Sequence, residues 1–314
     1  MMLGSTAAGL FWMFRYLERS ENIARLIEAG LRIALTQSGR ADDEWRSILT
    51  TTGSADGYFE QHDTIDGPAT IEYLLRSEAN PSSVLATVMS ARNNARAVRT
   101  ALTRETWEAT NNTWMELSEA LRKPVPAQDL PQVLALIRQE SAYVRGALHG
   151  TMLRNDIFNF SRLGTFIERA DNTARILDVK YYVLLPSPLH VGSRLDAVQW
   201  ETILRSVSAQ RAYRWQYTGE ISPTNIAHFL ILNERMPRSL AYSFNKIEQN
   251  LRHLANQYGA DHTCQAKAAQ LNNSARNRSI ASIFEEGLHE FLGQRVADTA
   301  ALANQIESDY RFYD

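Results

Sequence analysis

The sequence predicts an all-α protein, a helical bundle built from two related halves. Its 314 residues include only 15 glycines and nine prolines, which disfavours a turn-rich β fold and favours long helices. Apolar residues recur with the spacing of one helix face in the readable segments, and no segment shows the apolar–polar alternation of a half-buried strand. These observations indicate a bundle of helices without a sheet.

The first half of the chain is expected to contain at least three helices and a proline-rich linker. The first helix should begin at about Leu10 and end at Thr36, because its apolar residues lie on one side. Asn80 can cap the next helix, with Pro81 in the first helical position, where a proline loses no needed hydrogen bond. The expected ranges are 10–36 and 80–102 for the first two helices, 105–121 for a third helix or a pair of helices, and 123–131 for the linker.

The sequence pattern from residue 130 onward predicts four more helices. They are expected over 130–153, over 160–185, from Ser222 past Pro237, and over 279–310. Pro186 and Pro188 should stop the second of these helices and Pro237 should kink the third, because a proline removes a hydrogen bond and clashes with the preceding turn. The last helix is expected to be nearly uninterrupted.

Two segments of the first half recur in the second half. Residues 16–29 match residues 166–179, and the segment 45–49, which begins with Trp45, matches the segment 200–204, which begins with Trp200. The matches occur in the same order along the chain, as an internal duplication requires.

A third match lies between these segments in the same order. Asn80–Pro81 matches Ser222–Pro223, a register that aligns Arg96 with Arg238 and places Glu234 at the position of Arg92. We therefore expect one domain over residues 1–314. Its halves, about 1–150 and 151–314, should pack about a pseudo-twofold axis.

Charge and cysteine content exclude several classes of protein. The 33 basic and 35 acidic residues nearly balance, so there is no electrostatic case for binding nucleic acid. The single cysteine, Cys264, excludes an intramolecular disulfide framework and a cysteine zinc cluster. No apolar run approaches the ~18 residues that span a bilayer, and no signal peptide is visible. We expect a cytoplasmic protein without a membrane contact.

Standard catalytic and cofactor motifs are absent. The sequence lacks a Walker-type phosphate loop, a dinucleotide-binding glycine motif, a nucleophile elbow and an HExxH zinc helix. The seven histidines are scattered without metal-ligand spacing. We therefore expect no metal and no bound cofactor.

The repeated segments carry the candidate binding residues. Both contain the string Glu-Arg-x-Glu/Asp-Asn-x-Ala-Arg, called the ER string below. At about 100° per residue, the Glu, the Asn and the last Arg share one stripe of the helix, and the first Arg flanks it. The candidates are Glu18, Arg19, Asn22 and Arg25 in the first half, and Glu168, Arg169, Asn172 and Arg175 in the second.

Three environments for these stripes remain open. The first stripe lies opposite the apolar face of Leu17, Ile27 and Leu31, which favours a solvated surface. The repeated string instead indicates a geometric requirement. A buried ionic lock, in which Glu18 pairs with arginines of the other half, would meet it. A cleft between the halves would also meet it, with arginines binding an anionic group and glutamates binding an amine or acting as bases. Lock and cleft can coexist.

A second basic stripe is predicted on the next helix of the first half. Arg92, Arg96 and Arg99 share one face, with Asn93 beside them, and like charges repel unless acidic groups or a bound anion neutralise them. Nearby glutamates are one source of neutralisation and an anionic ligand is the other. Because Glu234 stands at the position of Arg92 in the second half, an anion site here should be asymmetric.

These motifs together resemble the bacterial alpha-E family, which is all-helical and named for its Glu-Arg motif. Pro237 and Glu234 make the corresponding helix of the second half fit the family pattern less well than that of the first. The resemblance spans nearly the whole chain and is carried by the strings at 16–25 and 166–175, Asn80-Pro-Ser-Ser83, the segment 91–99 and Glu105-Thr-Trp-Glu108.

The resemblance implies a genomic association rather than a reaction. Alpha-E proteins are typically encoded beside, or fused to, a circularly permuted ATP-grasp protein, often near a transglutaminase-like protease. ATP-grasp enzymes form amide bonds through an acyl-phosphate, so the resemblance implies a peptide-ligating or peptide-modifying system. A circularly permuted ATP-grasp protein is the expected partner, and a peptide or amino acid is the expected substrate.

Two main functions follow. The first is a non-catalytic partner that binds the ATP-grasp enzyme and holds its substrate in the Glu/Arg cleft. The second is an amide-forming transferase in which Glu18 or Glu168 is the general base and the arginines clamp an anion. A purely structural scaffold is the third possibility. We favour the first, because the sequence supplies no nucleotide motif, cofactor or obvious nucleophile.

Overall fold

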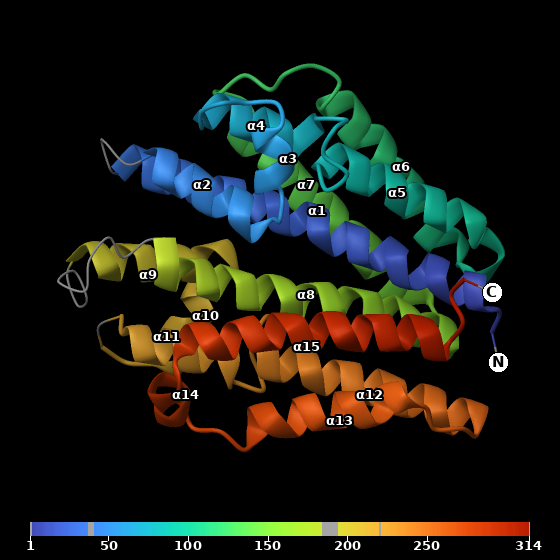
Figure 1. Ribbon diagram of the computed structural model, residues 1–314. Helices are drawn as coiled ribbons and strands as arrows, with labels where there is room; N and C mark the ends of the chain where they lie inside the picture. Colours follow the sequence, from blue (N-terminus) through green and yellow to red (C-terminus); the bar gives the residue numbers. More distant parts are fainter. Residues whose placement is uncertain (1, 37–40, 184–193, 220, 314) are drawn as a thin grey trace.

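A computed structural model describes residues 2–36, 41–183, 194–219 and 221–313 (Figure 1). These residues form fifteen α-helices and one 3₁₀ turn, and no β-strand occurs among them, which confirms the predicted all-α class. Within this described part, none of the helices combines the length and the apolar composition that a bilayer-crossing segment needs.

The helices fall into two runs along the chain. The first run is α1 (Gly4–Thr36), α2 (Ala41–Thr51), α3 (Ala55–Phe59), α4 (Gly67–Arg76), α5 (Val84–Ala97), the 3₁₀ turn η1 (Arg99–Ala101), α6 (Arg104–Ala120) and α7 (Leu130–Thr151). The second run is α8 (Asp156–Val183), α9 (Arg194–Ser206), α10 (Gln210–Gln216), α11 (Pro223–Ile231), α12 (Leu240–Tyr258), α13 (Thr263–Arg276), α14 (Ile280–Glu286) and α15 (Leu288–Asp309).

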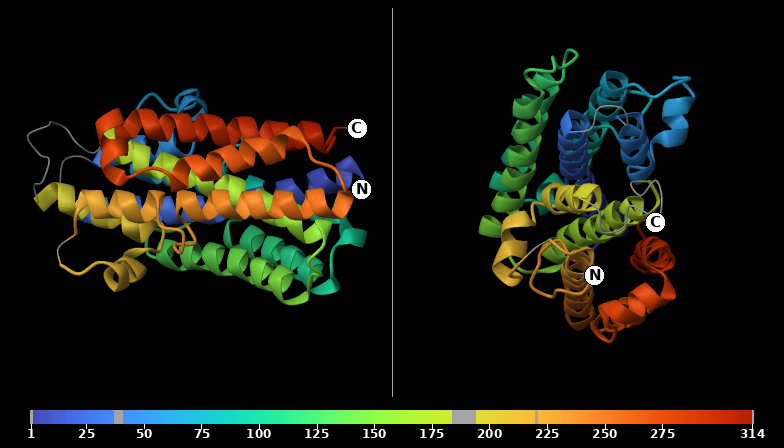
Figure 2. Two further views of the ribbon diagram at one scale, coloured as in Figure 1. Left: turned by 90° about the horizontal axis from the view of Figure 1, so that it is seen from below. Right: turned by 90° about the vertical axis from the view of Figure 1, so that its left-hand side faces the viewer.

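The two helices that carry the ER strings, α1 and α8, pack side by side in the middle of the bundle (Figures 1 and 2). Helix α1 also packs on α5 and α7, and α8 packs on α12 and α15. The other helices of the first run lie on one side of this pair and those of the second run on the other (Figure 2). Because neighbours surround both helices, polar as well as apolar faces of α1 and α8 become buried.

The helix expected from Ser222 past Pro237 is two helices. Helix α11 ends at Ile231, and α12 begins at Leu240. Between them Asn233 Oδ1 accepts hydrogen bonds from two backbone N–H groups, and Ser239 caps α12 by accepting from the N–H of Tyr242 at 3.0 Å. Pro237 therefore lies in a turn rather than at a kink, so that prediction was wrong.

Two other helix predictions need correction. The helix expected over 279–310 is divided at Gly287, whose φ of +108° is open to glycine but rarely to other residues. Asn80 does not cap α5: its side chain accepts from the N–H of Ser82 and donates to the carbonyl of Tyr73, and Ser83 is the cap. The predicted stop at residues 185–188 lies outside the described residues.

Several local structures occur once in each half. Helices α2 and α9 are both followed by a positive-φ residue, Gly53 (φ 67°) and Ser208 (φ 53°). The next N–H then donates back to the carbonyl of Leu49 at 2.9 Å in one half and of Leu204 at 2.7 Å in the other. Each turn is the left-handed helix end that satisfies exposed carbonyls. The turns after α2 and α9 therefore correspond.

Helices α5 and α12 also correspond. Each is capped by a serine, Ser83 or Ser239, and each has a proline two residues before the cap. This register pairs Ser82 with Arg238 and replaces the predicted register, in which Asn80–Pro81 matched Ser222–Pro223. Arg96 lies in the last turn of α5, whereas Arg238 precedes α12, so the predicted alignment of these arginines was wrong.

Helices α7 and α15 close their halves in the same way. Both are 22 residues long, and both begin with a buried leucine, Leu130 or Leu288. Counting from these leucines pairs buried Ser141 with buried Thr299, and it pairs Arg145 with Ala303. Such recurrences support an internal duplication, while the pseudo-twofold axis and the exact half boundaries stay predictions.

The close packing of α1 on α8 requires a glycine. A Cβ added at Gly164 of α8 would lie 2.0 Å from the carbonyl oxygen of Phe11 of α1, so Gly164→Ala must push the helices apart. We expect the substitution to lower the free energy of unfolding by roughly 1–3 kcal/mol in urea denaturation. The matched control is Gly146→Ala on α7, where a Cβ meets nothing within 4 Å. A control as destabilised as Gly164→Ala would contradict the packing argument.

Candidate functional site

The two ER strings meet through reciprocal salt bridges between α1 and α8. Arg169 donates to Glu18 through Nε at 2.9 Å and Nη2 at 2.8 Å. Arg19 donates to Glu168 through Nε at 2.6 Å and Nη2 at 3.0 Å. We call these two contacts the crossed ion pairs. Both are bidentate, the geometry in which a guanidinium recognises a carboxylate most strongly.

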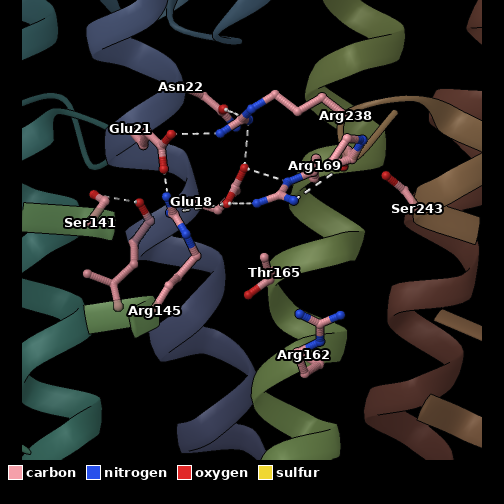
Figure 3. Close-up of polar contacts among 12 residues, drawn as sticks. Glu18, Glu21, Asn22, Ser141, Arg145, Arg162, Thr165, Arg169, Arg238 and Ser243 are labelled. Atoms are coloured by element: carbon pink, nitrogen blue, oxygen red, sulfur yellow. Dashed lines mark hydrogen bonds and ion pairs between the residues drawn. The ribbon is translucent and has the colours of Figure 1, made fainter. Parts of the chain in front are cut away.

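Further arginines surround the crossed ion pair of Glu18. Arg238, from the turn before α12, donates to Glu18 at 2.8 Å and to Glu21 at 2.7 Å. Arg145 of α7 contacts Glu21 and lies 3.6 Å from Glu18. Figure 3 shows the Glu18 carboxylate enclosed by the guanidinium groups of Arg145, Arg169 and Arg238. Three helices, α1, α7 and α8, and the turn before α12 thus converge on the acidic pair Glu18 and Glu21.

The crossed ion pair of Glu168 has fewer arginines around it. Besides Arg19, only Arg15 contacts Glu168 among the described residues, through Nε at 3.0 Å. Asp171, one turn further along α8, accepts a hydrogen bond from Arg175 at 2.8 Å. The acidic pair of the second half therefore depends mostly on arginines of α1 and α8 themselves.

The neighbouring arginines determine the protonation state of Glu18 and Glu168. Burial raises the pKa of Glu168, but the charges of Arg19 and Arg15 outweigh it and lower that pKa to about 2. Burial acts in the same way on Glu18, and Arg169, Arg238 and Arg145 hold its pKa well below the usual value. Both glutamates are therefore ionised at neutral pH.

The structure distinguishes between the environments considered for the stripes. A solvated surface was the wrong prediction for the glutamates: Glu18 is 1% exposed and Glu168 is 5% exposed, because neighbouring helices cover the face opposite the apolar one. The geometry is that of the ionic lock, with Glu18 paired to Arg169 and Arg238 of the other half. Desolvation offsets much of the attraction in such a lock, so its main effect is to fix how the helices pack.

A cavity opens on the Glu168 side of the lock. Its volume is about 300 Å³, at the lower end of the range for small-molecule sites. We call it the Glu168 cavity. Its charged and amide side chains come from α1, α8 and α15, and they are Arg15, Arg19, Asn22, Glu168, Asp171, Asn172, Arg175 and Asn304. The rest of the wall includes Thr51 at the end of α2, Thr52 and Gly53 after it, Ser82 before α5, and Thr299, Ala300 and Ala303 of α15.

Asn22 brings an unused hydrogen-bond donor to this wall. Its Oδ1 must face Arg238, which can only donate, and it accepts from Nη1 at 3.2 Å. The amide Nδ2 is buried and has no hydrogen-bond partner in the described structure, and Asn22 as a whole is 3% exposed. A buried donor without a partner costs ~1–3 kcal/mol, so an acceptor that reaches this Nδ2 would be stabilised there.

The predicted site residues do not all reach the cavity. Of the ER-string candidates, five line it: Arg19, Asn22, Glu168, Asn172 and Arg175. Glu18 and Arg169 lie in the lock, outside the cavity wall. Arg25 pairs with Glu21 at 2.5 Å and donates to Ser208, and it does not line the Glu168 cavity. The strings therefore form one lock, and only part of each string reaches the Glu168 cavity; Arg25 lines a separate cavity of about 300 Å³.

The second basic stripe lies elsewhere. Arg92 of α5 donates to the amide oxygen of Asn111 at 2.9 Å, and Asn93 and Arg96 are exposed. Arg99 is not on α5, which ends at Ala97, but in the 3₁₀ turn, with its guanidinium 5.2 Å from the centre of the Trp107 ring. None of these residues lines the Glu168 cavity. Glu234, expected at the position of Arg92, lies in the turn between α11 and α12.

Sequence reasoning did not select three arginines of the lock as site residues. Arg15 precedes the first ER string, and Arg145 belongs to no repeated motif. Arg238 was named only as the supposed counterpart of Arg96, in an alignment that was wrong. Arg145 and Arg238 have no basic counterpart in the other half, so a search for repeats cannot find them. Glu21 and Asp171 could have been found, because both occupy the same position of the ER string.

The described residues also show no cluster suited to a metal. No group of three or more His, Cys, Asp or Glu side chains among them has the spacing to hold an ion. Cys264 is buried, and burial raises the pKa of its thiol well above the usual value. The site offers carboxylates, guanidinium groups and amides, together with the hydroxyl groups of Thr51, Thr52, Ser82 and Thr299.

Two sets of helices joined by crossed Glu–Arg pairs between α1 and α8 define an all-helical class of protein with a duplicated ER motif. A model of the Alpha-E family, described as a predicted α-helical domain with a conserved ER motif, matches residues 2–310. The chain therefore belongs to the Alpha-E family.

The curated relatives are longer proteins. An uncharacterised protein of Mycobacterium bovis and one of Mycobacterium tuberculosis are each 23% identical over 318 residues, and a second Mycobacterium tuberculosis sequence is 22% identical. These matches cover 95% of this chain but only 35% of each relative, so the chain spans about a third of their length. No solved structure matches the chain.

A double-mutant cycle tests the lock. Arg169→Met removes a bidentate partner from buried Glu18, and we expect it to lower the free energy of unfolding by roughly 3 kcal/mol. Glu18→Gln should also destabilise, because it leaves arginines facing one another. The double variant should cost at least about 1 kcal/mol less than the sum of the single changes.

The control for this cycle is a surface pair. Arg122 and Glu119 are 63% and 71% exposed, and we expect Arg122→Met to change stability by no more than about 0.5 kcal/mol. Additive effects of Glu18→Gln and Arg169→Met in urea denaturation would show that the two side chains are not coupled.

The lowered pKa of Glu168 makes the free energy of unfolding depend on pH in the acidic range. A carboxyl with pKa about 2 when folded and about 4.5 when unfolded stabilises the protein fully above pH ~4.5. The contribution, on the order of 3 kcal/mol, is lost as the pH falls from 4.5 to 2. We therefore expect the unfolding free energy of Glu168→Gln to fall less steeply over this interval than that of the wild type. Equal slopes, measured by urea denaturation at each pH, would contradict the assignment.

Proposed function

We propose that this chain is a non-catalytic, ligand-binding partner in an amide-bond-forming system. Its catalytic partner is a circularly permuted ATP-grasp enzyme, and the Glu168 cavity holds the peptide or amino-acid substrate of that enzyme. Because the ligation consumes ATP, we propose the cytoplasm as its location. The single observation that carries the proposal is the cavity of about 300 Å³, lined by both guanidinium and carboxylate groups.

The lining of the cavity fits a zwitterionic ligand. Arg175 is 39% exposed and can reach an anionic group, while Asp171, 21% exposed, can accept from an amine. The unpaired Nδ2 of Asn22 adds a donor for a carbonyl or carboxylate oxygen. Amino acids and peptides carry both kinds of group, so a single molecule of this class can satisfy the three side chains.

The length of the relatives supports a role beside another catalytic unit. About two thirds of each relative lies outside the segment matched by this chain. In these relatives the segment similar to this chain is joined to a larger polypeptide, which favours a function shared with that additional part. The ATP-grasp partner follows from the family resemblance, in which such an enzyme is the usual neighbour.

The protonation of the glutamates favours binding over catalysis. A general base works best when its pKa lies near the operating pH, but the pKa of Glu168 is about 2 and that of Glu18 is also strongly lowered. Both carboxylates are already occupied by bidentate arginines. They are thus suited to hold the walls of the cavity, and not to remove a proton from a substrate.

A reconstitution experiment tests the proposed function. The chain is mixed with the circularly permuted ATP-grasp enzyme from the same genome, and ATP-dependent ligation of candidate peptides is followed by mass spectrometry. We expect the two proteins to co-purify and the ligation rate to rise at least about tenfold in the presence of this chain. Ala300→Trp, which fills the cavity mouth, should keep the association and remove the rate increase.

The matched control is Ala297→Trp. Ala297 is exposed on the same helix and does not line the cavity, so this variant should keep both association and stimulation. Absence of association together with a ligation rate that does not depend on this chain would refute the proposal. Ligation by the isolated chain would refute the non-catalytic role and favour the transferase.

A further inference from the structure

The Glu168 cavity has a counterpart in the other half of the molecule, where arginine side chains fill part of the corresponding space. The correspondences established by the recurring turns, caps and helices place Glu18, Glu21 and Arg25 opposite Glu168, Asp171 and Arg175. On the Glu18 side, Arg145 and Arg238 fill the space directly next to the acidic pair. Two separate cavities remain there, one of about 300 Å³ lined by Arg25 and Ser208 and one of about 220 Å³ lined by Arg145 and Arg169. On the Glu168 side the same space is the cavity. The side chains that differ between the two sides therefore indicate which chemical groups a ligand in the Glu168 cavity could supply.

Three cavity-lining residues are truncated relative to their counterparts. Arg145 of α7 corresponds to Ala303 of α15, and Arg238 before α12 corresponds to Ser82 before α5. Ser208 after α9 corresponds to Gly53 after α2, and both have positive φ. Ala303, Ser82 and Gly53 all line the Glu168 cavity. The cavity thus lies where two guanidinium groups and one hydroxyl are present in the other half.

Because the Glu168 side has no counterparts of Arg145 and Arg238, Asp171 has fewer arginine partners than Glu21. Glu21 is bound by Arg145, Arg238 and Arg25. Its counterpart Asp171 has only Arg175 as a bonded partner among the described residues, through Oδ2. Burial raises the pKa of Asp171, whereas the arginines around Glu21 lower the pKa of that residue despite its burial.

Because the Glu168 side has no counterpart of the Ser208 hydroxyl, Arg175 has fewer hydrogen-bond partners than Arg25. Arg25 uses its Nη1 to donate to the Ser208 hydroxyl. Gly53 offers no such acceptor to Arg175, which among the described residues contacts only Asp171, through Nε. The guanidinium of Arg175 therefore has donors that no other side chain in the described part of the chain uses. On the α1 side of the cavity, the amide Nδ2 of Asn22 is a second unused donor.

We propose that the Glu168 cavity binds a guanidinium-bearing amino acid or an arginine-containing peptide, whose cationic group replaces the missing arginines beside Asp171. The inference rests on the proposed function, because it specifies the ligand of the same site. The guanidinium of the ligand donates to Asp171, and its carboxylate or carbonyl oxygen accepts from Arg175 and from Asn22. Arg15, which has Thr165 as its counterpart, keeps Glu168 neutralised, so the ligand cation is directed to Asp171.

Binding to the isolated protein tests this inference. The probes are L-arginine and an arginine-containing tripeptide, each compared by calorimetry with its citrulline counterpart, which has nearly the same shape but no charge. We expect at least one arginine probe to bind about tenfold or more tightly than its citrulline counterpart, as the loss of a charge-assisted hydrogen bond implies. Asp171→Asn should remove this preference.

A variant that fills the cavity gives a second readout. Ala303→Arg places an arginine where the other half has Arg145, so it should abolish arginine binding and raise the unfolding temperature. Ala297→Arg, at an exposed position of the same helix, adds the same charge outside the cavity and should leave binding unchanged. If Ala303→Arg fails to fold, the Asp171→Asn comparison alone decides the question.

The outcomes separate the two proposals. Equal binding of the arginine and citrulline probes, or no binding of either arginine probe, overturns the ligand class. Wild-type affinity of Ala303→Arg or of Asp171→Asn for the arginine probes overturns the assigned position. All these results leave the partner role open to its own test, which measures ligation by the ATP-grasp enzyme rather than binding to this chain.

Discussion

Two buried carboxylates, each held by the arginine of the opposite helix, set the geometry of the whole bundle. Glu18 and Glu168 can be buried at the contact of α1 and α8 only if Arg169 and Arg19 reach them, since an unpaired buried charge would cost several kcal/mol. This requirement fixes the register and the spacing of the two central helices. The outer helices then pack around a pair whose position is already determined.

The differences between the halves matter more for function than the similarities. The Glu18 side is completed by Arg145 and Arg238, which makes it a structural centre. The Glu168 side has Ala303 and Ser82 at the corresponding positions and keeps a cavity beside Asp171. Under the proposed function, one copy of the ER string stabilises the bundle and the other lines the cavity that holds the ligand.

The sequence predicts the helical class, the duplication and the ER strings, because these depend on local periodicity and on identical residues at matched positions. It does not predict the burial of the polar stripe of α1, since a stripe opposite an apolar face is normally solvated and only the surrounding helices cover it. Arg145 and Arg238 are not predictable from repeats, because their counterparts are Ala303 and Ser82. The division at Gly287 and the turn around Pro237 depend on local backbone geometry that periodicity does not describe.

The most direct test of the crossed ion pairs is the exchange rate of the arginine Nε–H protons by NMR. Arg19 and Arg169 donate their Nε–H groups to Glu168 and Glu18 in a contact from which water is largely excluded. The two Nε–H signals should therefore persist at neutral pH, and each should be lost when the opposite glutamate is replaced by alanine. Exchange of both signals as fast as that of an exposed arginine such as Arg122 would show that the central helices are not joined in this way.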